Sequence, residues 1–128
     1  MASVVVVDAS SVVDLLLSSD RAPGIVEATA GCIFAAPAHI DEEVLTALAR
    51  LQRAGTSAVE MRTRVEVLLT MPLERHALPP LVRGAWARQA NLSIADGFYV
   101  ELAEQLGTNL VTCDRGMAAA TSRAILVQ

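Results

Sequence analysis

The sequence contains no lysine, and all ten of its basic residues are arginine. This absence excludes a P-loop, which needs a lysine beside the phosphates of its nucleotide. It also excludes Schiff-base catalysis, which needs a side-chain amine. A receiver domain also clusters acids at its strand ends, but such a domain depends on a lysine that this chain does not have.

Cysteines and long uninterrupted apolar runs are scarce as well. The two cysteines, Cys32 and Cys113, are too few and too widely separated for a disulfide scaffold or a zinc ribbon. The apolar run "SVVVVDASSVVDLLL" is interrupted by Asp8 and Asp14, which argues against a membrane-spanning helix. No basic residue precedes Arg21, so a secretory signal is not expected. We therefore expect a cytoplasmic protein.

Length and charge limit the class of protein. The chain has 128 residues, of which 53% are hydrophobic and 19% charged, enough to bury a core in one domain spanning residues 1–128. The formal net charge of −4 argues against a protein that coats nucleic acid passively through a basic surface. A negative chain is still compatible with a local site that binds cations.

Apolar segments alternate with amphipathic segments along the chain. The β-branched run at 3–7 is typical of a strand buried on both faces. Further strands are predicted at 32–37, 73–78, 109–113 and 124–128, and helices at 10–18, 24–30, 39–54, 57–70, 79–88, 92–106 and 115–122. This alternation predicts an α/β fold with a parallel sheet and helices on both faces. In such sheets the functional crevice lies beyond the carboxyl ends of the strands.

Two aspartates directly follow predicted strands and therefore lie at that edge of the sheet. Asp8 follows the strand at 3–7, and Asp114 follows "LVTC". Each aspartate is also a good N-cap for the helix after it, so either of them alone has an ordinary structural explanation. Thr112 could orient a carboxylate or a water through its hydroxyl.

Two further acids lie on the apolar faces of predicted helices. In "HIDEEVLTALARLQRAG", Glu43 shares the buried stripe, whereas Glu42 faces the polar side. Asp41 lies in the first turn, and we expect both Asp41 and Glu42 to be solvated. Asp96 breaks the apolar stripe of "LSIADGFYVELAEQLG", where an unpaired carboxylate is costly to bury. Ser93 offers an alternative explanation, because Asp96 could be its partner in an imperfect capping box.

The four acids Asp8, Glu43, Asp96 and Asp114 together predict a cation site. Four carboxylates about 5 Å apart would repel by roughly 3 kcal/mol per pair at an effective dielectric constant of about 20. A hard divalent cation such as Mg²⁺ or Mn²⁺ relieves this repulsion, because it prefers oxygen ligands and keeps several waters. Such a site suits phosphodiester hydrolysis, in which the ion polarises the phosphate and lowers the pKa of the attacking water.

Four segments of the chain resemble the acidic motifs of PIN-domain ribonucleases, and more narrowly those of the VapC toxins of bacterial toxin–antitoxin pairs. They are "VVVVDASSVVDLL", "APAHIDEEVLTAL", "LSIADGFYVELAEQLG" and "LVTCDRGMA". The resemblance covers essentially the whole chain and is weak between 56 and 85. It implies that the catalytic, metal-binding acids are Asp8, Glu43, Asp96 and Asp114. Ser10 and Thr112 match its accessory hydroxyl positions.

The same resemblance implies a fold and partners. The expected fold is a three-layer α/β/α PIN-like fold with a five-stranded parallel sheet in the order 3-2-1-4-5. The expected activity is endonucleolytic cleavage of RNA that depends on Mg²⁺ or Mn²⁺, carried out by a homodimer. A VapB-type antitoxin is expected to inhibit it in a heterotetramer or larger assembly. Gly97 departs from the family, which usually has a residue such as alanine beside the third acid; the glycine costs about 1 kcal/mol of helix propensity but removes no ligand.

Two other functions stay open at this point. The same fold could serve as a non-catalytic module that binds RNA or protein, although such a module has no reason to keep mutually repelling carboxylates. The chain could also be a Mg²⁺-dependent phosphohydrolase of small phosphate esters. Such an enzyme would usually have a second acid two residues after its nucleophilic aspartate, and here Ser10 occupies that position.

Several other conspicuous residues have ordinary explanations. We expect His39 and His76 to be surface or helix-end residues, since neither has the spacing of a metal ligand. Trp86 is expected in the core or in a dimer contact rather than as a platform for base stacking. Cys113 is expected to be a buried small hydrophobe.

The remaining arginines and apolar helices carry weaker expectations. Arg83, Arg88 and Arg115 could meet phosphates near the crevice, but a solvated face explains them as well. The apolar helices at 11–17 and 57–70 could form a groove for an antitoxin helix. Plain packing in the core would produce the same sequence pattern.

Overall fold

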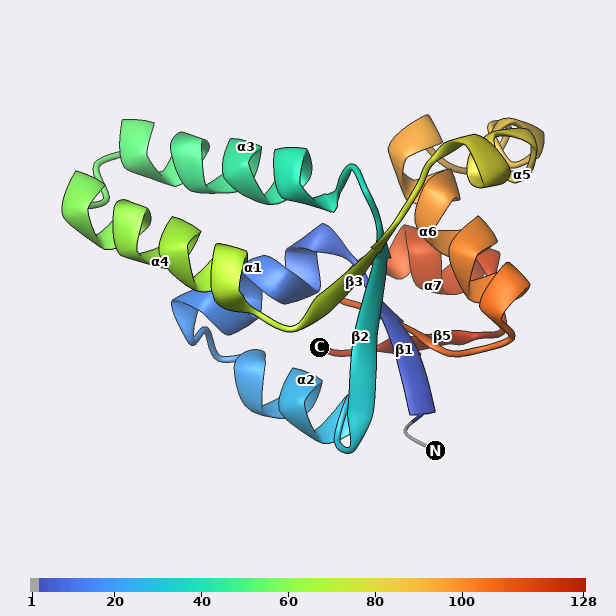
Figure 1. Cartoon of the computed structure of the whole chain (residues 1–128), viewed down its shortest axis with the longest axis horizontal. Coiled ribbons are helices and arrows are strands. Elements are labelled where there is room, and N and C mark those ends of the chain that lie inside the picture. The colour runs from blue at the N-terminus through green and yellow to red at the C-terminus, as the bar shows by residue number, and fades with distance from the viewer. Residues whose placement is uncertain (1–2) are drawn as a thin grey trace.

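The computed structural model describes residues 3–128, so residues 1 and 2 of the expected domain lie outside the described part of the chain. Over this range five parallel strands form one sheet in the order β3-β2-β1-β4-β5, which confirms the expected order (Figure 1). The strands are β1 (Ser3–Val7), β2 (Cys32–Pro37), β3 (Leu73–His76), β4 (Leu110–Thr112) and β5 (Ala124–Leu126).

Helices cover both faces of the sheet. They are α1 (Ala9–Leu17), α2 (Ala22–Ala28), α3 (Ile40–Arg53), α4 (Ala58–Thr70), α5 (Val82–Ala87), α6 (Ile94–Leu106) and α7 (Arg115–Ala120). In Figure 1, α1 to α4 lie on one side of the sheet and α5 to α7 on the other, which confirms the three-layer α/β/α architecture. None of the helices within residues 3–128 is long and apolar enough to span a bilayer.

Most of the observed helix boundaries differ from the predicted ones by one or two residues, and two of the differences have a clear physical cause. The helix expected at 24–30 begins at Ala22, so Pro23 lies in its first turn. A proline fits there because the N–H groups of the first turn have no partner within the helix. The helix expected at 79–88 divides into a 3₁₀ turn, Pro79–Leu81, and α5. Two consecutive prolines have no N–H to donate, so the turn is closed by the N–H groups that follow them, from Leu81 to the Leu78 carbonyl at 2.8 Å and from Val82 to the Pro79 carbonyl.

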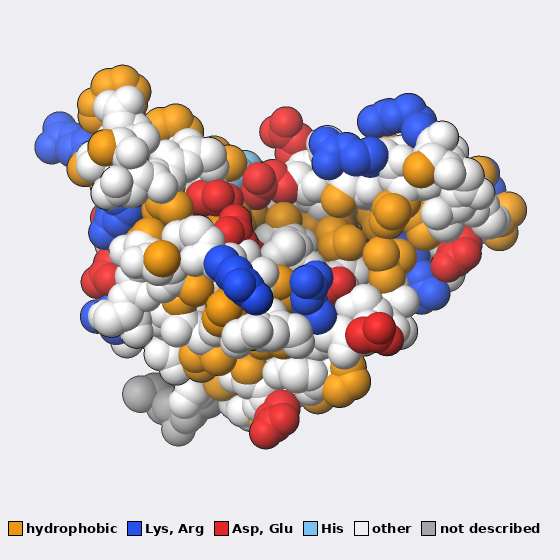
Figure 2. Space-filling model, turned by 180° about the vertical axis from the view of Figure 1, so that it is seen from behind, with side chains coloured by type: hydrophobic (Ala, Val, Ile, Leu, Met, Phe, Trp, Pro, Cys, Tyr) orange, Lys and Arg blue, Asp and Glu red, His pale blue; other side chains and the backbone are white. Residues whose placement is uncertain are grey.

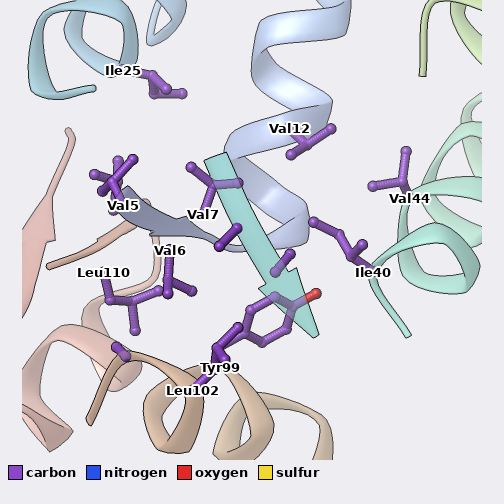
Figure 3. Close-up of a cluster of buried hydrophobic side chains, with 14 of the residues drawn as sticks. Val5, Val6, Val7, Val12, Ile25, Ile40, Val44, Tyr99, Leu102 and Leu110 are labelled. Atoms are coloured by element: carbon purple, nitrogen blue, oxygen red, sulfur yellow. The ribbon is translucent and has the colours of Figure 1, made fainter. Parts of the chain in front are cut away.

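The hydrophobic core lies on both faces of β1. Val5, Val6 and Val7 are at most 2% exposed, and their side chains point alternately to opposite faces. Figure 3 shows Val5 and Val7 on the side of Val12 and Ile25, which come from α1 and α2, and Val6 on the side of α6. Burial on both faces explains why this strand is an unbroken run of valines rather than an alternating pattern.

The central strands β1 and β4 are neighbours although they are far apart in the sequence. Val7 of β1 pairs with Val111 of β4, so Asp8 and Thr112 come next at the same carboxyl edge. The strand order reverses here, because β2 and β3 lie on one side of β1 while β4 and β5 lie on the other. Open α/β sheets bind their ligands at such a topological switch point.

Candidate active site

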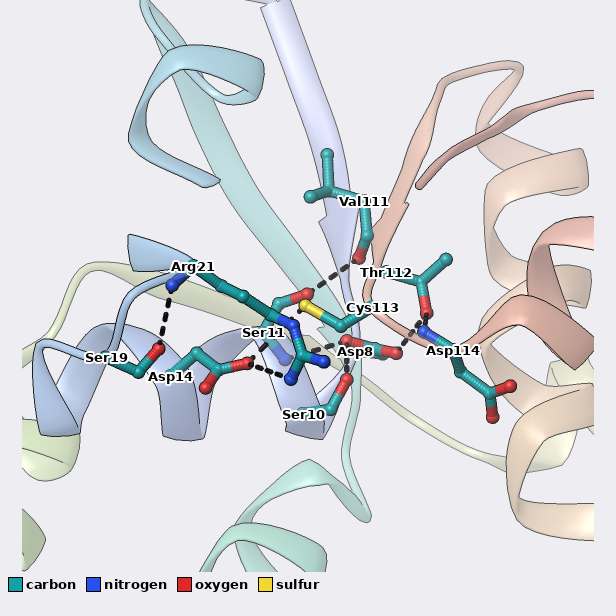
Figure 4. A network of polar contacts seen from close by, with 10 residues as sticks. All are labelled: Asp8, Ser10, Ser11, Asp14, Ser19, Arg21, Val111, Thr112, Cys113 and Asp114. Carbon is teal, nitrogen blue, oxygen red and sulfur yellow. Dashed lines mark hydrogen bonds and ion pairs between the residues drawn. The ribbon is translucent and has the colours of Figure 1, made fainter. Parts of the chain in front are cut away.

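Asp8 is buried at the junction between β1 and α1, with only 3% of its surface exposed. Its Oδ1 accepts hydrogen bonds from the Ser11 N–H and from the Ser10 hydroxyl, both at 2.9 Å. Its Oδ2 accepts from the Thr112 hydroxyl at 2.6 Å (Figure 4). These three donors compensate the burial of a carboxylate. Asp8 is thus the N-cap of α1 and, at the same time, a residue of the candidate site.

Asp114 caps α7 in the same way, but its side chain is exposed. Its Oδ1 accepts from the N–H groups of Gly116 at 2.7 Å and Met117 at 3.4 Å, whereas Oδ2 has no hydrogen bond within residues 3–128. The Asp114 N–H donates to the Thr112 hydroxyl at 3.0 Å. Thr112 therefore contacts both strand-end aspartates, donating to one and accepting from the other.

Glu43 lies in the first turn of α3, on the face that packs inward. Its Oε1 accepts a hydrogen bond from the Tyr99 hydroxyl of α6 at 2.7 Å and lies 3.4 Å from His39 Nε2. The side chain is 31% exposed. Burial, and next the hydrogen bond to Glu43, raise the pKa of the Tyr99 hydroxyl, so this group stays protonated and acts as the donor.

Asp96 lies in the first turn of α6 and is partly buried. Its N–H donates to the Ser93 hydroxyl at 3.1 Å, so the capping explanation is also correct. Burial is the main cause that raises the pKa of the Asp96 carboxyl, and the charge of Asp114 is the second. A hydrogen bond with Ser93 opposes the shift, while the charges of Glu43 and Asp8 add to it. Asp96 therefore experiences the repulsion of all three other acids.

The four predicted acids line one cavity at the carboxyl edge of the sheet. Its volume is about 180 Å³, and its lining consists of Asp8, Ala9, Ser10, Glu43, Asp96, Tyr99, Asp114 and Met117. Acids from two strand ends and two helix faces, spread over more than 100 positions of the sequence, thus come together as expected. Figure 2 shows Asp and Glu side chains gathered in a hollow between two lobes of the molecule.

The chemistry of this donor set fits a hard divalent cation. Within residues 3–128, no three Asp, Glu, His or Cys side chains are placed closely enough to hold an ion directly. Asp8, Glu43 and Asp114 each direct an oxygen to a donor of the protein itself. Mg²⁺, however, binds through only one or two carboxylates and keeps several waters, so ligands farther apart are compatible with it.

Asp41 and Glu42, the acids beside Glu43 on α3, do not line the cavity. Glu42 is exposed, as predicted. The expectation that Asp41 is merely solvated is wrong, because Asp41 binds Arg75 of β3 through two hydrogen bonds of 2.7 and 2.9 Å. The hydrogen bond to Asp41 raises the pKa of the Arg75 guanidinium. The sequence spacing gave no indication of this pair, since 34 positions separate its members.

Two site residues were not recognised from the sequence. Tyr99 fits the apolar stripe of α6 and so has the pattern of an ordinary core residue, yet its hydroxyl binds Glu43. His39 is a helix-end residue as expected, but its side chain is only 12% exposed and contacts both Glu43 and α6. The available signals were the four-residue step from His39 to Glu43 and the three-residue step from Asp96 to Tyr99, which place each pair on one helix face.

Three further expectations concern residues outside the acid quartet. Trp86 of α5 is 63% exposed and so does not belong to the core. Arg88 is not simply solvated, because its guanidinium forms an ion pair with Glu101 of α6. Cys113 is only partly buried, and its thiol lies 3.5 Å from Asp14 Oδ2 (Figure 4). Burial raises the pKa of the Cys113 thiol.

Comparison with known proteins agrees with this geometry. The model of the PIN domain family matches residues 5–122. Ribonuclease VapC3 of Mycobacterium tuberculosis is 47% identical over 118 residues, which cover 91% of this chain and 86% of that protein. The crystal structure of PAE2754 from Pyrobaculum aerophilum superposes with a TM-score of 0.74 at 27% identity, covering 99% of this chain and 85% of that one.

A fourth similarity concerns the fold alone. A toxin–antitoxin complex from Klebsiella pneumoniae contains a chain that superposes with a TM-score of 0.69 at 18% identity. The match covers 94% of this chain and 95% of that one. Taken together with the site geometry, the family-model match and the 47% identity lead to one conclusion. The chain belongs to the PIN-domain family and, within it, to the VapC proteins.

Proposed function

We propose that this chain is a cytoplasmic endoribonuclease toxin that hydrolyses RNA phosphodiester bonds with the help of Mg²⁺ or Mn²⁺. The observation that carries the proposal is the cavity into which four separate segments bring Asp8, Glu43, Asp96 and Asp114. The proposal is supported by the identity with a relative that bears the name ribonuclease.

Each acid of the cavity has a defined part in the proposed reaction. Asp8 is held rigidly by three donors, and Glu43 is held by Tyr99, so these carboxylates keep their orientation. Oδ2 of Asp114 accepts no hydrogen bond from residues 3–128, and Ser93 is the one hydrogen-bond partner of the Asp96 carboxyl in that range, so each carboxylate keeps an oxygen for a ligand. When bound, a divalent ion would neutralise these charges, polarise the phosphate and lower the pKa of the attacking water.

The hollow around the cavity suits a polymeric substrate. Glu43 also lines a second depression, which follows α3 as far as Arg50. Thr46 and Ala47 are part of its lining. An RNA strand could therefore extend from the acids along α3, where the Arg50 guanidinium would meet a backbone phosphate. Because the whole chain is negative, such local contacts and the cation, rather than the overall field, would supply the attraction for RNA.

An antitoxin and a second copy of the chain are the proposed protein partners. An apolar groove of about 330 Å³ runs between α3 and α4, and its lining includes Leu45, Met61 and Val65. Exposed apolar side chains continue this surface on α4, where Leu69 is 68% exposed. We propose that a helix of a VapB-type antitoxin covers this groove, and that exposed Trp86 of α5 lies in a homodimer contact within a heterotetramer or larger assembly.

Cleavage of a structured RNA by the purified chain tests the nuclease proposal. We expect cleavage with Mn²⁺ or Mg²⁺, none with EDTA, and a loss of at least about 100-fold in Asp8→Asn and Asp96→Asn, because a directly bound ligand contributes at least as much as the groups that orient it. Equal cleavage by these variants would reveal a contaminating nuclease. Binding of RNA without cleavage would favour the non-catalytic module, and hydrolysis of nitrophenyl phosphate but not RNA would favour a small-molecule phosphohydrolase.

A further inference from the structure

The helices that carry Glu43 and Asp96 are tied to each other by two reciprocal contacts. Tyr99, on the same helix as Asp96, reaches across to Glu43 with its hydroxyl at 2.7 Å. His39, at the start of the helix that carries Glu43, reaches back to the Ala95 carbonyl with Nε2 at 3.0 Å. Each contact spans 56 positions of the sequence and joins the first turn of α3 to the first two turns of α6.

The Tyr99 contact divides the two oxygens of Glu43. Oε1 accepts from Tyr99 and is the oxygen near His39. Oε2 has no hydrogen bond to any residue between 3 and 128. Tyr99 is only 1% exposed, so its ring is held by packing and its hydroxyl has little freedom to leave the carboxylate. The contact thus leaves Oε2 as the oxygen available to a ligand.

His39 is fixed in a similar manner. Its ring lies against those of Phe98 and Tyr99, with centroid distances of 5.1 and 4.9 Å. A carbonyl oxygen only accepts hydrogen bonds, so Nε2 carries a proton and donates it to Ala95. Nδ1 is buried and has no hydrogen-bond partner among the described residues. Among residues 3–128, the polar contacts of this largely buried ring therefore point to α6 and to Glu43.

We propose that Tyr99 and His39 are positioning residues, which hold the start of α3 against the start of α6 so that Glu43 and Asp96 serve the same divalent cation. The inference rests on the proposed metal-dependent function and extends it to two residues outside the acid quartet. Neither residue is proposed to contact the ion or the RNA. Their effect passes through the carboxylate of Glu43 and the main chain beside Asp96.

Calorimetric titration of the RNA-free full-length chain with Mn²⁺ tests the part of Tyr99. Tyr99→Phe removes the hydroxyl and keeps the ring, so we expect the fold to persist and the dissociation constant for Mn²⁺ to rise about 10- to 100-fold. Thr29→Val is the matched control, because Thr29 is also buried and its hydroxyl donates at 2.8 Å to the Ile25 carbonyl, away from the cavity. We expect Mn²⁺ affinity to be unchanged in that control.

Combined substitutions separate positioning from a general loss of stability. If Tyr99 acts through Glu43, Tyr99→Phe weakens Mn²⁺ binding no further once Glu43→Gln is present. For the histidine, His39→Gln keeps an N–H at a similar reach and should retain most of the affinity, whereas His39→Ala should lose it. RNA cleavage by Tyr99→Phe should return close to the unaltered rate at saturating Mn²⁺, because only ion binding is impaired.

Each outcome bears on a different statement. If Tyr99→Phe and Thr29→Val bind Mn²⁺ equally well, or if the losses from Tyr99→Phe and Glu43→Gln add, the positioning inference is overturned while the nuclease proposal stands. If Tyr99→Phe weakens Mn²⁺ binding as expected but the unaltered chain cuts no RNA, the nuclease proposal fails and the positioning inference stands. If the unaltered chain binds no Mn²⁺, the cation site itself is refuted.

Discussion

Thr112 donates its hydroxyl hydrogen to Asp8 Oδ2 at 2.6 Å, across 104 positions of the sequence. The same hydroxyl oxygen accepts the Asp114 N–H at 3.0 Å. Thr112 is fully buried, so water does not replace either contact when one is lost. This single side chain therefore connects the carboxyl ends of β1 and β4, the two strands between which the cavity opens.

We expect Thr112→Val to lower both stability and activity. The substitution keeps the shape of the side chain but leaves the Asp8 carboxylate without one of its three donors, which should reduce the free energy of unfolding by about 1–3 kcal/mol. RNA cleavage should fall about 10- to 100-fold, because Asp8 loses orientation. Urea unfolding and cleavage assays measure the two effects. Thr112→Ser keeps the hydroxyl and serves as the control; equal losses in both variants would contradict the role of the hydrogen bond.

Asp96→Asn is expected to stabilise the metal-free protein while abolishing its activity. Burial and the charge of Asp114 raise the pKa of Asp96 in the folded chain, so the folded state loses stability as the pH rises through that raised pKa. In EDTA the variant and the unaltered chain should therefore melt alike below about pH 3.8, the ordinary pKa of the group. At neutral pH the variant should melt about 2 °C higher, a small gain because the group is partly solvated.

Thermal melts against pH measure this difference between the two proteins. Asp20→Asn is a suitable control, because Asp20 is exposed and lies outside the cavity. A melting temperature of Asp96→Asn that is lower than that of the unaltered chain at neutral pH would show that the carboxylate is already compensated without a cation.

Addition of Mn²⁺ or Mg²⁺ should raise the melting temperature of the unaltered chain. A ligand that binds only the folded state adds about 2.7 kcal/mol to stability at a concentration of 100 times its dissociation constant. The rise should disappear with EDTA and should be much smaller in Asp8→Asn. Ca²⁺ at the same concentration controls for ionic strength and for non-specific binding to surface carboxylates. A uniform rise in both proteins would indicate binding elsewhere than the cavity.

Gly97 lies where the backbones of α6 and α5 pack closely against each other, which explains the small residue at this position. A Cβ at this position would lie 3.1 Å from the Ala85 carbonyl oxygen and 3.2 Å from its Cα, so α6 and α5 are in close backbone contact here. Gly97→Val should therefore lower the free energy of unfolding by about 1–3 kcal/mol. Ala119→Val, on the exposed side of α7, should cost well under about 1 kcal/mol. Similar losses in the two variants would refute a close contact of α5 and α6.

Periodicity predicted the alternation of strands and helices and the two helical acids, whereas Asp8 and Asp114 were predicted from their places after strands and the strand order from the family resemblance. The run of valines at 3–7 indicated a doubly buried strand, and the three-residue step from Ile40 to Glu43 separated Glu43 from Glu42. These predictions succeed because the position of a side chain on a strand or helix follows from the local backbone geometry. The sequence by itself thus determined that Glu43, rather than Glu42, lies on the inward face of its helix.

Only the tertiary structure decided which partners those carboxylates have. The pairs Tyr99 with Glu43, Thr112 with Asp8, and Arg75 with Asp41 each join segments that strand order and helix packing bring together. A hydrophobic pattern reports that a face is buried, but not what is buried against it. The partner depends on contacts between distant segments, and these are established only when the whole sheet has assembled.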